Sequence, residues 1–198
     1  NAGVTVSIVG ISQHTEENKK LYSVDKEGST TLKKTVFINA YLIAADNVII
    51  QSYSKPLFEL PEMSFGNMPN DNGHLLLSKG EAWQAIQNHN VPTKYIRPFY
   101  GSQEFIKGFP RYCVWIIEDE SKEAYQNQWL LKRFQQIKQS RLKSNRPTTQ
   151  ALAKKPYLFG EVRQQGDEKT IVVPAISSEN REYLPVGLLP EKSIVANS

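Results

Sequence analysis

The segment YIRPFYGSQEFIKGFPRYCVWII, residues 95–117, decides the fold that this sequence predicts. It opens with the strand-like pair Tyr95-Ile96 and ends in residues 112–117, a continuous apolar run rich in aromatic and β-branched side chains. Such a run is typical of a buried central strand. Between these ends, proline, glycine and cationic residues predict a loop that is held rigidly and can present side chains to a partner. The alternative is an ordinary hairpin with a solvated tip.

Composition places the chain among globular proteins of one domain, or of one domain plus a fragment. Of its 198 residues, 39% are apolar and 22% are charged, which is not the composition of a disordered chain. No apolar run approaches the roughly 20 residues of a membrane helix, and we expect no signal peptide. The one cysteine, Cys113, lies in the apolar run, where an inert buried thiol is expected. These features predict a cytoplasmic protein without a membrane partner.

The positive charge is concentrated in one segment. Between Ala124 and Gly160 there is no Asp or Glu, and eight Lys and Arg residues give this segment a charge of +8. Because the whole chain has a net charge of +4, the remainder carries 4 − 8 = −4. Such an asymmetry favours a surface that faces phosphates, and the alternative is a solvated helix face. The cations of the segment are Lys132, Arg133, Lys138, Arg141, Lys143, Arg146, Lys154 and Lys155.

The first third of the chain has weaker patterns. Residues 3–11 alternate and then run apolar, which predicts an interior strand. Residues 12–34 are polar and predict a surface connector with one short strand near residues 21–24. Residues 35–50 are apolar with a break at Asp46-Asn47, which predicts two strands, or a helical turn and a strand. Residues 55–78 are dense in Pro, Gly and Asn and predict an ordered irregular loop anchored by Met63 and Phe65.

Three helices are expected, and the shortest is capped by Thr148 and runs to Ala153. Ser78 and Glu81 have the spacing of a capping box, which predicts a short helix to about Asn88. The longest helix is expected from about residue 121 to 143, because Leu130, Phe134 and Ile137 form an apolar stripe. Its outward face would then carry aromatic, Gln and Lys side chains; the alternative is that the aromatics pack elsewhere. With short strands at residues 157–162, 170–173 and 182–189, the pattern indicates an α+β fold with a mixed, mainly antiparallel sheet.

The chain resembles a known family in three segments. Residues 98–112 contain the pattern Pro98, Phe99-Tyr100, Gly101, Glu104, Ile106, Gly108 and Arg111-Tyr112. This pattern resembles the segment that opens the target-recognition region of MmeI-like (type IIL restriction–modification) DNA adenine-N6 methyltransferases. The strings KPLFELPEMSFGNMPNDNGHLLLS (55–78) and VVPAISSENREYLPVGLL (172–189) are also similar to that family.

The resemblance implies that the chain is a fragment of a larger protein. Residues 1–34 would be the end of the catalytic domain and a connector, and residues 35–198 a C-terminally incomplete, truncated specificity domain. This domain would bind duplex DNA so that a separate catalytic domain can flip and methylate adenine with S-adenosylmethionine. The other domains of the same polypeptide would be its partners, and some members are fused to an endonuclease. The alternatives are a structural connector with little DNA contact, or an RNA-binding module.

The fragment itself is expected to hold no catalytic, cofactor-binding or metal-binding residue. It has no Gly-rich loop for S-adenosylmethionine and no Pro-Pro pair of the kind that holds a flipped base. We expect the loop and helix cations to form one DNA-facing surface, with Gln103 and Asn180 as the better candidates for base edges. The residues expected near DNA are Arg97, Tyr100, Ser102, Gln103, Lys107, Arg111, Lys132, Lys138, Arg141, Lys143, Arg146, Arg163, Ser178, Asn180 and Arg181.

Overall fold

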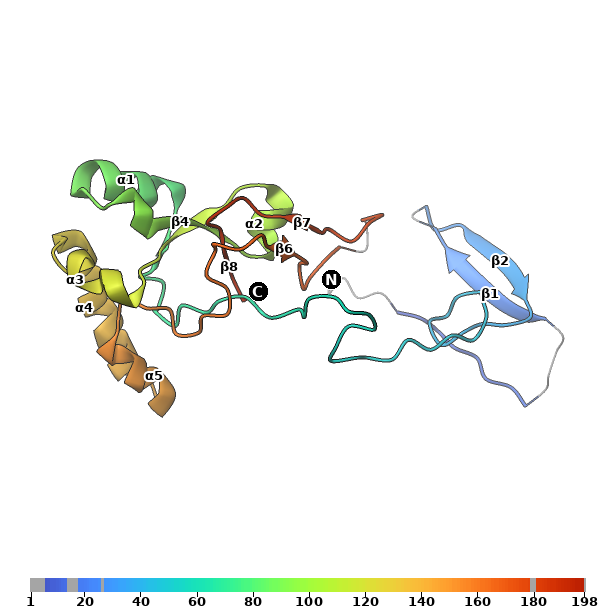
Figure 1. The fold of residues 1–198 in the computed structure, drawn as a ribbon. Helices are drawn as coiled ribbons and strands as arrows, with labels where there is room; N and C mark the ends of the chain where they lie inside the picture. Colours follow the sequence, from blue (N-terminus) through green and yellow to red (C-terminus); the bar gives the residue numbers. More distant parts are fainter. Residues whose placement is uncertain (1–5, 14–17, 26, 179–180, 198) are drawn as a thin grey trace. The chain divides into compact units, whose positions relative to one another are not determined.

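The structure is a computed structural model that describes residues 6–13, 18–25, 27–178 and 181–197. It contains two compact units, residues 1–62 and residues 63–198, and each is described by itself (Figure 1). The predicted α+β class is confirmed, because helices are combined with small sheets whose described strand pairs are antiparallel with one exception. None of the described helices is long and apolar enough to cross a lipid bilayer.

The N-terminal unit is built on one hairpin. Strand β1 (Lys19–Val24) pairs antiparallel with β2 (Thr30–Thr35). The Asp25 carboxylate accepts the N–H of Ser29 at 2.7 Å, and Gly28 supplies the left-handed residue of the turn at φ +83°. The strand predicted near residues 21–24 is therefore confirmed. Its partner β2 was missed, because a Thr- and Lys-rich strand carries no apolar alternation.

Two predictions for the N-terminal unit are wrong. Residues 6–11 form no strand and are exposed, while residues 3–5 lie outside the described part of the chain. Residues 36–50 form bends, one turn and irregular chain in place of strands or a helix, and the Asn39 side chain closes the turn by accepting the N–H of Tyr41 at 3.0 Å. Apolar composition predicted strands here, but a strand also needs a neighbouring edge to pair its backbone, and no described segment supplies one.

A four-stranded sheet forms the centre of the C-terminal unit. Its order is β3 (Leu76–Leu77), β5 (Arg111–Val114), β4 (Ile96–Tyr100) and β8 (Ile194–Val195). Strand β5 is antiparallel to both neighbours, and β8 is parallel to β4. The buried central strand predicted within residues 112–117 is confirmed, although the strand itself ends at Val114. Burial raises the pKa of the Cys113 thiol above its ordinary value, as expected of an inert cysteine.

The rigid loop predicted between the two strands is wrong, because its middle is a helix, α2 (Ser102–Lys107). The Glu104 carboxylate accepts the N–H of Gly101 at the start of α2 at 2.9 Å. Gly108 ends the helix in the left-handed conformation at φ +73°. The two glycines that predicted a loop are thus the end residues of a short helix.

The predicted helices are confirmed with changes of boundary. Helix α1 (Lys79–His89) begins at the Ser78–Glu81 capping box. The long helix α4 (Gln128–Leu142) begins where the Asn127 side chain accepts the N–H groups of Trp129 and Leu130, both at 3.1 Å. The expected start near residue 121 instead belongs to a separate short helix. The remaining elements are η1 (Thr93–Tyr95), η2 (Glu118–Glu120), α3 (Ser121–Ala124), α5 (Pro147–Ala151), η3 (Leu152–Lys154), β6 (Ile171–Val172) and β7 (Gly187–Leu188).

The irregular loop predicted at residues 55–78 is anchored differently from the expectation. Met63 and Phe65 are exposed, so their predicted packing role is wrong. Asn67 is buried in their place, donates to the carbonyl of Gln164 at 2.9 Å and accepts the N–H of Arg163 at 2.7 Å. A buried amide with both its donor and its acceptor satisfied ties the loop to a segment almost one hundred residues later. The strand predicted at residues 157–162 reduces to an isolated bridge between Met68 and Glu161.

Arg141 is the largest fully buried side chain and is only 1% exposed. Its Nε donates to the carbonyl of Asn70 at 2.9 Å. Each of its other two nitrogens donates to two carbonyls, and the acceptors are Leu152, Lys155, Pro69 and Leu158 at 2.7–3.0 Å. A guanidinium has five N–H donors, so every donor is satisfied internally. The expectation that Arg141 faces DNA is therefore wrong: it joins α4, η3 and residues 69–70.

Replacing Arg141 measures how much its hydrogen bonds contribute to the stability of the fold. We expect Arg141→Met to lower the free energy of unfolding by more than about 3 kcal/mol, because several buried carbonyls lose their donor. Urea unfolding followed by circular dichroism measures the loss. Lys138→Met removes an exposed cation from the same helix and should change the free energy by no more than about 0.5 kcal/mol. Equal losses in the two variants would contradict the structural role of Arg141.

Candidate nucleic-acid interface

A tight turn at residues 70–74 is held against α4 by two arginines of that helix. Arg141 binds the carbonyl of Asn70, and Arg133 donates to the carbonyl of His74 at 2.6 Å. The turn needs left-handed residues, which are Asn70 at φ +47°, Asn72 at φ +55° and Gly73 at φ +84°. These left-handed residues belong to the Asn- and Gly-rich loop that the sequence predicts at residues 55–78.

The interior of this turn is fixed by Asp71, which is buried. Its carboxylate accepts the N–H of Gly73 at 3.1 Å and also that of Leu75. The charges of Arg141 and Asp71 attract each other, and this attraction opposes the lowering of the Arg141 pKa that burial causes. The turn is therefore ordered by the hydrogen bonds of its buried carboxylate and by the arginine contacts to its carbonyls.

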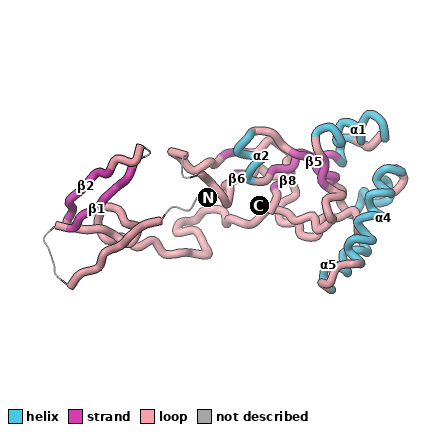
Figure 2. The backbone as a smooth tube through the Cα atoms, turned by 180° about the vertical axis from the view of Figure 1, so that it is seen from behind, coloured by secondary structure: helices cyan, strands magenta, loops and turns pink. Residues whose placement is uncertain are grey.

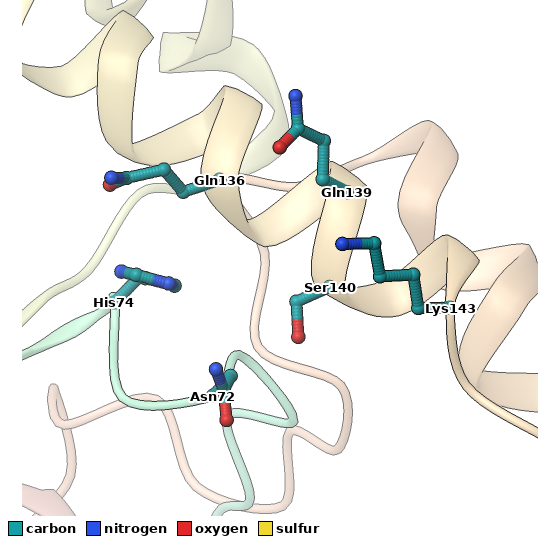
Figure 3. Close-up of a pocket in the computed structure, with 6 residues that line it drawn as sticks. All are labelled: Asn72, His74, Gln136, Gln139, Ser140 and Lys143. Carbon is teal, nitrogen blue, oxygen red and sulfur yellow. The ribbon is translucent and has the colours of Figure 1, made fainter.

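A shallow polar depression lies between the turn and α4, and we call it the α4 groove. Its volume is about 270 Å³, and it adjoins a second depression of about 400 Å³ that continues to Arg146. Figure 3 shows that the side chains come from the turn on one side and from α4 on the other. The residues of the first depression are Asn72, His74, Gln136, Gln139, Ser140 and Lys143.

Several side chains of this region are exposed and unpaired within the described chain. Those of Gln136, Gln139 and Lys143 make no hydrogen bond or ion pair within the part of the chain that the structure describes. Among the same described residues, the side chains of Lys132, Lys138 and Arg146 also make none. Donors and acceptors of this kind are available to phosphates and to base edges, which are the two kinds of group that nucleic acids present.

Other predicted cations are engaged within the chain. Arg97 donates to the carbonyl of Gln165 at 2.7 Å. Arg111 pairs with Glu104 at 2.8 Å, the same carboxylate that caps α2. Arg163 donates to the carbonyl of Gly66 at 2.9 Å and pairs with Glu161. These three arginines stabilise local structure, so each has fewer N–H donors available for a partner.

The remaining predicted residues lie apart from α4. Gln103 and Lys107 are exposed on α2, Ser102 is half-buried there, and Tyr100 in β4 has a pKa that burial raises. Figure 2, seen with Figure 1, places α4 and α5 at one end of the C-terminal unit and α2 beside β6, away from that end. The exposed cations of α2 and those of α4 thus lie on separate elements, and the prediction that they share one DNA-facing surface stays a prediction. Ser178 and Arg181 are exposed near residue 179, and Asn180 lies outside the described residues.

The two aromatic residues that the sequence placed on the long helix contact other side chains of the chain, and Tyr125 precedes α4. Trp129 is half-buried, stacks on His89 at 5.9 Å and lies 4.2 Å from the Arg133 guanidinium. Tyr125 packs edge-on against Phe134 at 5.2 Å and Tyr157 at 5.8 Å. The alternative that these aromatics pack elsewhere in the molecule is thus the one observed. These contacts cover the rings only in part, because Tyr125 stays 37% exposed.

Acidic residues close to the helices also have partners. Glu118 pairs with Lys155 at 3.0 Å and accepts the Tyr157 hydroxyl at 2.9 Å, and both interactions hold the pKa of Glu118 below its usual range. No group of three or more potential metal ligands occurs among the residues that the structure describes. The features that sequence reasoning missed are Asn72 and His74, for which the Asn-Asp-Asn-Gly run at residues 70–73 was the available signal.

Three comparisons with known proteins agree. The family model described as MmeI, target recognition domain, matches residues 44–198. DNA methyltransferase A of Bacillus subtilis (strain 168) is 38% identical over 198 residues, which are 100% of this chain and 22% of that protein. A solved structure of the type IIL restriction-modification enzyme MmeI in complex with DNA is 31% identical, with a TM-score of 0.74, over 93% of this chain and 25% of that chain. The chain spans about a quarter or less of these relatives, and the predicted resemblance is confirmed.

The negative charge of Glu81 is expected to stabilise the fold near Arg133 at neutral pH and to lose this effect in acid. Hydrogen bonds from Ser78, and then the Arg133 charge, lower the pKa of Glu81 from its ordinary value of 4.5. A lowered folded-state pKa gives stability that is present above pH 4.5 and is lost as the pH falls through the folded-state pKa.

The variant Glu81→Gln keeps the hydrogen-bond acceptor and removes the charge. At pH 7 it should lower the free energy of unfolding by no more than about 1 kcal/mol, since the carboxylate is half exposed. Urea unfolding at pH 7 and at about pH 3 measures the difference from the unaltered chain. We expect the difference to shrink toward zero in acid. A difference that does not change with pH would show that the charge contributes nothing.

Proposed function

Because the chain belongs to the MmeI target recognition domain family, we propose that it binds duplex DNA on behalf of a longer DNA methyltransferase or restriction–modification enzyme. The observation that carries the proposal is a group of exposed cations on and just after α4 that have no partner among the described residues, namely Lys132, Lys138, Lys143 and Arg146. Lysine and arginine side chains of this kind contact phosphates and release condensed counterions, which supplies affinity that does not depend on sequence.

The charge distribution of the same segment supports this proposal. Residues 125–159 contain no acidic side chain, and of their eight cations the structure engages Arg133, Arg141 and Lys155 internally. The remaining cations therefore create a positive electrostatic potential that no acidic residue of the same segment reduces. A segment that served only as a solvated helix face would gain nothing from this exclusion of acids.

In this proposal the chemistry belongs to the rest of the longer protein. A separate catalytic domain flips the target adenine, methylates its exocyclic amine and binds S-adenosylmethionine. This chain has no Gly-rich loop or Pro-Pro pair that would fit the methyl donor or the flipped base. Residues 1–34 would connect to that domain, and residues 35–198 would form the recognition part. The exposed residues of α2 and those near residue 179 would supply further contacts.

Charge reversal tests the proposed DNA surface. We expect the triple variant Lys138→Glu, Lys143→Glu and Arg146→Glu in the longer protein to weaken duplex binding by about 100-fold or more at low salt. The logarithm of affinity should also fall less steeply with the logarithm of salt, by about one unit of slope for each phosphate that is no longer neutralised. Titration of a fluorescent duplex between roughly 50 and 200 mM salt measures both quantities.

The control reverses three exposed lysines elsewhere in the C-terminal unit, namely Lys79, Lys122 and Lys169. It has the same change of net charge and should retain most of the affinity and the salt slope. Equal losses in both triple variants would contradict a localised DNA surface. A preference of the unaltered protein for single-stranded DNA or RNA would favour the RNA-binding alternative, and no binding at all would favour the connector.

A further inference from the structure

One face of α4 carries a regular polar stripe. Lys132, Gln136, Gln139 and Lys143 follow one another at spacings of 4, 3 and 4 residues, so they lie on a single face of the helix. All four are exposed. The opposite face is buried through Leu130, Phe134, Ile137 and Arg141. The order along the exposed face is therefore cation, amide, amide, cation.

The chemistry of the stripe and of the α4 groove selects the kind of ligand. Enclosed small-molecule sites are mostly apolar and bury most of their ligand. The depression of about 270 Å³ is lined only by amide, imidazole, hydroxyl and ammonium side chains. The amides of Gln136 and Gln139 have no hydrogen-bond partner within the described residues. Such a surface fits an extended polar ligand with charge at its borders.

The dimensions of the stripe fit the major groove of duplex DNA. From Lys132 to Lys143 the helix rises roughly 16 Å at 1.5 Å per residue. The major groove is about 12 Å wide and admits an α-helix. Lysines at the two ends can then reach the phosphates that border the groove, while the amides between them face its floor.

We infer that the exposed face of α4 enters the major groove and that Gln136 and Gln139 read base edges there. This inference rests on the proposed DNA binding and goes beyond it, because it assigns sequence-reading residues. A glutamine amide makes a bidentate pair with the N6 and N7 atoms of adenine, so the preferred base pairs are A·T. Lys132 and Lys143 contact the phosphates that border the major groove. Asn72 lines the α4 groove of the protein together with the two glutamines.

The inner face of α4 gives the reading side chains a rigid base. Arg141 and Arg133 attach the turn at residues 70–74 to the same helix that carries the stripe. A contact that distinguishes bases needs its donors and acceptors held in place by the surrounding structure. Arg141, which is buried, and Arg133, which is partly buried, provide that support without belonging to the exposed stripe.

The test is selection of preferred sequences from a duplex library with a randomised core, using the longer protein. The unaltered protein and the single variants Gln136→Ala and Gln139→Ala are compared. We expect each variant to relax the preference at one or two base pairs by roughly 5- to 150-fold, the range of a good bidentate contact. Affinity for unrelated duplex should stay unchanged. The variants Gln136→Glu and Gln139→Glu should shift the preference toward cytosine, whose N4 amine donates to a carboxylate.

Two exposed glutamines of α1, Gln84 and Gln87, serve as matched controls, and their alanine variants should keep the preference of the unaltered protein. An unchanged preference in the Gln136 and Gln139 variants overturns the inference and leaves the proposed function standing. A loss of affinity that is equal for every sequence shows phosphate contact only and also overturns it. If the unaltered protein fails to bind duplex DNA, the proposed function falls as well.

Discussion

The guanidinium of Arg141 is the interaction on which the C-terminal unit depends. Five hydrogen bonds from one side chain reach backbone carbonyls before α4, at residues 69–70, and after it, at residues 152–158. A buried cation is costly unless its donors are satisfied, and here backbone dipoles satisfy all of them while Asp71 contributes a compensating charge. The helix, the turn beside it and the segment that follows are thereby fixed as one piece.

This arrangement divides the cations of the basic segment by task. Arg133 and Arg141 serve the interior of the fold, and Lys132, Lys138, Lys143 and Arg146 remain on its exterior. A planar guanidinium can satisfy several carbonyls at once, whereas a lysine ammonium is a mobile point charge that suits phosphates. Within α4 the division follows the chemistry of the two side chains, and it leaves the exposed face of this helix to the amides and lysines.

Local signals were readable from the sequence, and tertiary ones were not. The capping box of α1, the apolar stripe of α4 and the buried strand β5 depend on neighbouring residues, so their spacing predicts them. Arg141 continues the buried stripe four residues after Ile137, but its charge suggested an exposed position. Helix α2 was missed because the glycines at its ends suggested a loop. The side of the α4 groove that the turn at residues 70–74 forms depends on contacts between distant segments, which no local sequence pattern encodes.

The most direct measurement is the rate at which individual lysines are acetylated, with and without saturating duplex DNA at low salt, read by mass spectrometry. Lys132, Lys138 and Lys143 are compared with Lys79 and Lys122, which are also exposed but lie on other helices. If α4 faces DNA, acetylation of the first three slows several-fold while the last two react at unchanged rates. Slowing at Lys79 and Lys122 with no change at the three α4 lysines would contradict the assignment of this face to DNA.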